Sequence, residues 1–170
     1  MKRLPVRVRR AVASDGAALA RLYRDARRWL LARGNRQWRD ERFTAGSLRR
    51  NIGATPVLVA TLGGRIVGAV QIEWRDPAFW PDRPGGDALY IRRLVVDRGV
   101  VGRAVAQRLL LDVAAIARGR HRWRLRLDCA PLAALARIYR RLGFTQIDES
   151  DLGGYRVYRF ERLSAPRPLP

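Results

Sequence analysis

Residues 94–110 of this chain read LVVDRGVVGRAVAQRLL. This stretch starts with the apolar residues of a strand, passes through a short loop and opens a helix predicted to bury Val105 and Leu109. A strand that turns directly into a helix points several unpaired backbone N–H groups at one spot, and the helix dipole adds partial positive charge there. We therefore expect this junction to bind a diphosphate.

Hydrophobic patterns on both sides of this stretch predict alternating strands and helices. Strands are expected over 6–10, 57–61, 65–74, 88–96 and 123–129, helices over 15–34, 45–53, 103–119 and 134–144, and a last hairpin at Gly153 and Gly154. This order predicts a single α/β domain over 1–163, with a central mixed sheet and helices on both faces. The tail 164–170 is expected to be disordered.

Composition narrows the class of protein. The chain has 170 residues, 48% of them hydrophobic, with no run of 18 apolar residues, which predicts a soluble cytoplasmic protein without a membrane span. Its single cysteine, Cys129, forms no internal disulfide, and no metal-binding cluster is expected. The net charge of +20 is open to two interpretations, solvated faces or attraction to a polyanion such as nucleic acid.

Two motifs carry a resemblance to a known family. Residues 94–110 resemble the acetyl-CoA-binding motif of the GNAT superfamily, and ARIYRRLGF, 136–144, resembles its helix with a tyrosine four residues before Gly-Phe. The similarity, to small bacterial members, covers about residues 6–161. It implies the GNAT-like acyl-CoA N-acyltransferase fold, with acetyl-CoA or another acyl-CoA as the cofactor.

The resemblance also implies which residues bind the cofactor. The backbone of Leu94, Val95 and Val96 would pair with the pantetheine arm, and Arg98 and Arg103 would meet phosphate charge. The amides that would hold the pyrophosphate belong to Val101, Gly102, Arg103, Ala104, Val105 and Ala106.

The sequence departs from the family pattern at three positions. Val101 stands in place of Gln or Arg, Ala104 in place of the first glycine, and Leu132 near the place of a cofactor-facing asparagine. We expect Ala104 to tolerate helical φ and to put a methyl group close to the phosphate path. These departures leave open a GNAT-derived protein with altered or lost acetyl transfer.

Acetyl transfer to an amine needs a base, because only about one amine in a thousand is neutral at pH 7. Glu73 is the first candidate and Asp128 the second, with capping or salt bridging as the alternative role for both. By its position in the motif, Tyr139 would be the acid that protonates the leaving thiolate, unless it only packs in the core.

Several residues are candidates for the acceptor side. RGNRQW, 33–38, and WRDPAFW, 74–80, are similar to segments that flank the acceptor pocket in the small bacterial members, so Trp38, Trp74 and Trp80 are predicted to bind substrate. Arg92, with Arg93, would suit a carboxylate on the acceptor. The acceptor is expected to be an amine of a small molecule or peptide. A homodimer and a nucleic-acid-associated module remain open.

Overall fold

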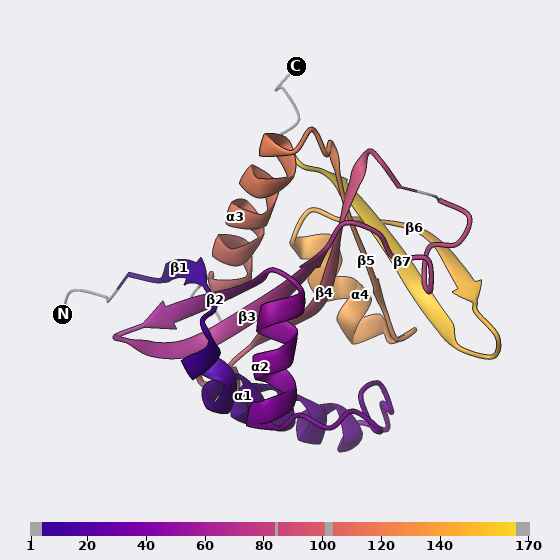
Figure 1. Cartoon of the computed structure of the whole chain (residues 1–170). Helices are drawn as coiled ribbons and strands as arrows, with labels where there is room; N and C mark the ends of the chain where they lie inside the picture. The colour runs from indigo at the N-terminus through magenta and orange to yellow at the C-terminus, as the bar shows by residue number, and fades with distance from the viewer. Residues whose placement is uncertain (1–4, 84, 101–103, 166–170) are drawn as a thin grey trace. The chain divides into compact units, whose positions relative to one another are not determined.

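The computed structural model describes residues 5–83, 85–100 and 104–165. Figure 1 shows the chain as a succession of strands and helices. In chain order these are β1 (Arg7–Arg10), the 3-10 turn η1 (Ala13–Asp15), α1 (Gly16–Leu31), α2 (Ala45–Ala54), β2 (Val57–Leu62), β3 (Arg65–Glu73), β4 (Ala88–Val96), η2 (Arg98–Val100), α3 (Val105–Gly119), β5 (Arg124–Cys129), α4 (Ala133–Arg141), β6 (Thr145–Asp151) and β7 (Arg156–Leu163).

The seven strands form one mixed sheet in the order β1-β2-β3-β4-β5-β7-β6. Strands β1 and β2, β2 and β3, β5 and β7, and β6 and β7 pair antiparallel, whereas β4 and β5 pair in parallel. The predicted α/β fold with a mixed sheet is therefore confirmed. The expected elements also form within a few residues of their predicted bounds.

The chain divides into two compact units, and the first comprises residues up to Gln71 together with 93–110. In this unit α1 and α2 pack their apolar side chains against one face of the strands. That core contains Leu19, Leu22, Tyr23, Phe43, Leu48, Val57, Val59 and Val95. On the other face, a Cβ at Gly68 would lie 2.8 Å from Val105 Cγ1 at the start of α3. Helices thus cover both faces here, and the glycine lets α3 approach the strand.

The second unit comprises Ile72–Arg92 and the residues from Leu111 onward. Its core includes Leu125, Leu127, Val157 and Phe160 on β5 and β7. The single domain expected over 1–163 stays a prediction. Of the expected tail, residues 166–170 lie outside the described residues, whereas Ser164 donates its N–H to Trp123 O at 2.9 Å.

Local sequence signals explain several element boundaries. Thr44 begins α2, and its side chain accepts a hydrogen bond from the Ser47 N–H at 3.0 Å, as a capping residue does. Gly63 and Gly64 both have positive φ, as the tight turn between β2 and β3 requires. Among the described residues, no helix is long and apolar enough to cross a membrane.

Candidate active site

Arg92 on β4 and Asp128 on β5 follow the last parallel pair between these strands. The register runs from Ala88–Arg124 to Tyr90–Arg126, and at that last pair Arg126 Nη1 donates to Tyr90 Oη at 3.2 Å. Side chains two residues apart on a strand share a face, so Arg92 and Asp128 lie on the same face as this pair. The structure thus brings two of the predicted residues together in the second unit.

Asp76 binds Arg92 from the loop that follows β3. Arg92 Nη1 donates to Asp76 Oδ2 at 2.6 Å, and the Asp76 side chain is only 2% exposed. Burial lowers the pKa of Arg92, but the negative charges of Asp76, Asp128 and Glu73 outweigh burial and raise this pKa above its ordinary value. Asp76 was not predicted as a site residue. Its position before Pro77 in a loop reads as a turn signal, and only the fold brings it to Arg92.

The carboxyl group of Asp128 has an unusual affinity for protons. Burial raises its pKa to about 6; the positive charge of Arg92 lowers it, and the negative charge of Asp76 adds to the rise. A carboxylate with a pKa near neutrality accepts a proton more readily than an ordinary aspartate. Glu73, the first candidate from sequence, lies at the end of β3, where its charge helps to raise the pKa of Arg92.

Tyr139 on α4 lies near Asp128 and Cys129. Burial raises the pKa of Tyr139, and the charges of Cys129 and Asp128 raise it further, so the phenol keeps its proton at neutral pH. Its ring lies 5.5 Å from that of Phe160, centroid to centroid. Burial also raises the pKa of Cys129 to about 12. At neutral pH this buried side chain is therefore a thiol and not a nucleophilic thiolate.

The predicted pyrophosphate loop is described from Ala104 onward, since Val101, Gly102 and Arg103 lie outside the described residues. Helix α3 begins at Val105, and Arg108 N–H donates to Ala104 O at 2.9 Å as its first turn closes. The N–H groups of Val105 and Ala106, at the first positions of α3, have no partner within the helix. The helix start therefore fits a bound diphosphate.

The expectation that Ala104 takes a helical φ is wrong. Its φ is +56°, in the left-handed region that favours glycine. The reason is positional, because Ala104 is the last residue before α3 and turns the chain into the helix. The glycine of the family pattern would occupy this conformation without strain.

Replacing Ala104 with glycine should stabilise the fold. A left-handed alanine is strained by about 1–2 kcal/mol, part of which the larger unfolded-state entropy of glycine offsets, so we expect a gain of about 0.5–1 kcal/mol in the free energy of unfolding. Urea denaturation measures this gain. The matched control, Ala106→Gly inside the first turn of α3, should instead lose about 1 kcal/mol. Equal losses in both variants would contradict the strain at Ala104.

Arg98 is held beside this loop by an aromatic ring. Its guanidinium carbon lies 3.6 Å from the centre of the Trp29 ring, and that of Arg33 lies 4.0 Å from the same centre. Burial and the positive charge of Arg33 both lower the pKa of Arg98. The ring of Trp29 on α1 thus fixes the guanidinium of Arg98 in place. The contact of Arg98 with phosphate stays a prediction.

The three predicted substrate tryptophans lie in different surroundings. Trp38, in the first unit, packs its ring against Tyr23 and Phe43. Trp74, in the second, is half-buried with Arg120 over its ring. Trp80 is 1% exposed, with Arg126 and Arg159 over its ring at 5.4 and 4.9 Å, so this side chain anchors its loop by packing. Its predicted contact with substrate would need that loop to move.

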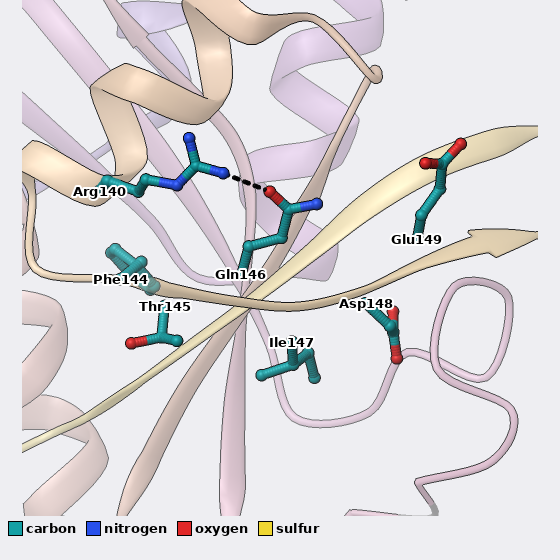
Figure 2. Close-up of a pocket in the computed structure, with 7 residues that line it drawn as sticks. All are labelled: Arg140, Phe144, Thr145, Gln146, Ile147, Asp148 and Glu149. Atoms are coloured by element: carbon teal, nitrogen blue, oxygen red, sulfur yellow. Dashed lines mark hydrogen bonds between the residues drawn. The ribbon is translucent and has the colours of Figure 1, made fainter.

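A hollow of about 520 Å³ lies beside β6 and the end of α4, and Figure 2 shows the residues that line it. There Arg140 Nη2 donates to Gln146 Oε1 at 2.7 Å, and Ile147 and Asp148 point to the same side of β6, where the register with β7 shifts between Gln146 and Asp148. Its lining residues include none of the predicted site residues. Within 5–83, 85–100 and 104–165, no group of three or more His, Cys, Asp or Glu side chains could hold a metal ion.

Comparison with known proteins decides the family. The model of the Acetyltransferase (GNAT) family matches residues 18–144, which is most of the chain. The chain belongs to the GNAT acetyltransferase family. An uncharacterised N-acetyltransferase of Bacillus subtilis strain 168, YesJ, is 28% identical over 163 residues, covering 89% of this chain and 87% of YesJ.

Solved GNAT structures share the fold. A GNAT acetyltransferase from Listeria monocytogenes has a TM-score of 0.74 at 22% identity, covering 96% of this chain and 98% of its own. The PaiA N-acetyltransferase from Thermoplasma acidophilum, solved with coenzyme A, also has a TM-score of 0.74, at 16% identity, covering 94% of this chain and 99% of its own. These likenesses confirm the GNAT fold predicted from the two motifs.

A second departure from the GNAT pattern, after that at Ala104, can be followed in the structure. Leu132, near the place of the family's asparagine, is the N-cap residue of α4 and makes no side-chain cap hydrogen bond. An apolar N-cap leaves the first N–H groups of α4 without a side-chain acceptor. In this GNAT protein the polar side chain expected near the cofactor is therefore missing at that position.

Proposed function

We propose that this GNAT protein transfers an acetyl group from acetyl-CoA to an amine of a small molecule or peptide. The observation that carries the proposal is the pairing of Asp128, whose pKa is near 6, with Tyr139, which keeps its proton. At neutral pH most of Asp128 is ionised while Tyr139 keeps its proton, so the two groups suit the roles of base and acid.

Acetyl-CoA supplies a thioester whose acyl carbon the amine attacks, releasing the thiol of coenzyme A. Asp128, as the carboxylate, accepts the proton that the amine loses when its new bond forms. Tyr139 donates its O–H to the sulfur that gains negative charge. Asp128 thus takes up one proton and Tyr139 gives up one, so the charges balance over the reaction.

The first unit offers groups that fit the cofactor. The helix start at Val105 and Ala106 supplies N–H groups, and we assign the backbone of Leu94, Val95 and Val96 to the pantetheine arm. Arg98 adds positive charge beside the loop. That the Thermoplasma neighbour holds coenzyme A supports this assignment.

The charges around Arg92 favour an acceptor without a carboxylate. Its guanidinium is bound to the buried Asp76 and faces the charges of Asp128 and Glu73. An acidic acceptor would have to displace Asp76 and leave a buried carboxylate without its partner, which is strongly unfavourable. We therefore assign Arg92 to orienting Asp76 and Asp128 and not to binding an acceptor carboxylate.

Two measurements test the proposed function. With acetyl-CoA a hundredfold above its Kd, linkage adds about 2.7 kcal/mol to the free energy of unfolding, so the melting temperature should rise. Release of free thiol should then depend on an added amine, and amines without a carboxylate should be preferred. A raised melting temperature without turnover of any amine would favour a GNAT protein that binds coenzyme A but has lost acetyl transfer.

A further inference from the structure

Strand β4 leaves regular strand geometry at Arg93. Its φ is +51°, a conformation that is strained for any residue with a side chain. The Tyr23 hydroxyl donates a hydrogen bond to the Arg93 carbonyl at 3.0 Å, so α1 holds the main chain at this point. Strained residues persist where surrounding contacts fix them, and they are often found at functional sites.

The side chain of Arg93 reaches the segment between α1 and α2. Arg93 Nη2 donates to both carboxylate oxygens of Glu41 at 2.9 Å, and Nη1 donates to Gln71 Oε1 at 3.3 Å. The two charged side chains are 22% and 40% exposed. A guanidinium that is partly shielded and bonded to three oxygen atoms holds its partners more firmly than an exposed ion pair does.

The same segment is fixed by aromatic packing around a second strained residue. Trp38 has a φ of +68°, and its ring lies 5.8 Å from that of Tyr23 and 5.7 Å from that of Phe43. The Arg93 guanidinium lies 5.8 Å from the centre of the Phe43 ring. Arg27 Nη1 also donates to the Glu41 carbonyl at 2.6 Å. Two strained residues far apart in sequence, Trp38 and Arg93, are therefore joined through one cluster.

We infer that Arg93 and Glu41 form a positioning pair for the amine acceptor, because they hold residues 32–44, which include the segment 33–38 predicted to flank the acceptor pocket. The inference rests on the proposed function and extends it to residues that the proposed chemistry does not use. The pair joins side chains, while the main chain of β4 is held separately by Tyr23. Breaking the pair should therefore loosen the acceptor segment and leave acetyl-CoA binding unchanged.

Steady-state kinetics of four variants test this role. Glu41→Gln and Arg93→Gln should each raise KM for the amine roughly tenfold, while kcat and the Kd for acetyl-CoA change by less than about twofold. The double variant should be little worse than either single one, because both remove the same interaction. The exchanged pair, Glu41→Arg with Arg93→Glu, should recover part of the lost affinity.

Asp40→Asn is the matched control, because Asp40 forms an exposed pair with Arg39 in the same segment. Its KM should equal that of the wild type. Unchanged KM in the Glu41 and Arg93 variants, or an equal loss of acetyl-CoA affinity, would overturn the inference. Additive losses in the double variant would also overturn it.

Hydrogen exchange tests the pair independently of catalysis. The N–H groups of Arg39 and Glu41 donate to Arg36 O at 2.9 Å and Trp38 O at 3.2 Å. In Glu41→Gln these amides should exchange faster than in Asp40→Asn. If the wild type acetylates no amine, the proposed function is wrong. Hydrogen exchange then still tests the pair, because equal exchange rates in Glu41→Gln and Asp40→Asn would reject it.

Discussion

An Asp128→Asn variant is expected to transfer acetyl groups on the order of 10²- to 10⁴-fold more slowly than the wild type, because it cannot accept the amine proton. The Kd for acetyl-CoA should stay the same, since Asp128 is assigned to the amine. Turnover followed by release of free thiol measures the first effect, and calorimetric titration measures the second.

The pH dependence of the same reaction reports on Asp128. Because its pKa in the folded protein is about 6, kcat/KM should fall as the pH drops through 6, and Asp128→Asn should lose this limb of the profile. The ordinary value is 3.8, so the folded chain holds this proton more tightly than the unfolded chain. The free energy of unfolding should therefore fall as the pH rises from about 4 to 6.

Two comparisons separate catalysis from stability and identify the base. Asparagine removes a charge that burial disfavours, so the variant should be at least as stable as the wild type at pH 7. Glu73→Gln is the matched control for the other candidate base and should keep most of its activity. A large loss in Glu73→Gln together with an active Asp128→Asn would assign the base to Glu73.

A Tyr139→Phe variant should lower kcat by about 10²-fold, because the ring remains while the proton donor is lost. The raised pKa of Tyr139 keeps the wild-type phenol protonated, so this loss should be uniform across neutral pH. Stability should change little, since phenylalanine keeps the contact with the Phe160 ring.

Tyr155→Phe is the control for this substitution. Tyr155 is 52% exposed, and its ring packs against Phe79. We expect wild-type kcat and KM in this variant. A Tyr139→Phe enzyme with unchanged kcat would remove Tyr139 from the mechanism and leave it as a packing residue of α4.

The sequence predicted the elements well because their signals are local. The cap at Thr44 and the paired glycines Gly63 and Gly64 act within a few residues, and the structure places α2 and the β2–β3 turn where they predict. The order of elements and the two motifs were enough to predict the GNAT fold, which the family match confirms.

The site was less predictable because its groups come from distant segments. Asp76 meets Arg92 only after the loop following β3 folds back, and Glu41 meets Arg93 across 52 residues. Choosing between Glu73 and Asp128 depends on burial and neighbouring charge, which strand alternation does not reveal. The left-handed backbone of Ala104 was missed because alanine rarely adopts it.

We propose that main-chain amides at the start of α3 hold the diphosphate of acetyl-CoA. A crystal structure of the chain with acetyl-CoA tests it most directly. We predict phosphate oxygens about 3 Å from the N atoms of Val105 and Ala106. A diphosphate bound elsewhere on the chain, with these N–H groups bonded to water or to neighbouring side chains, would contradict the account.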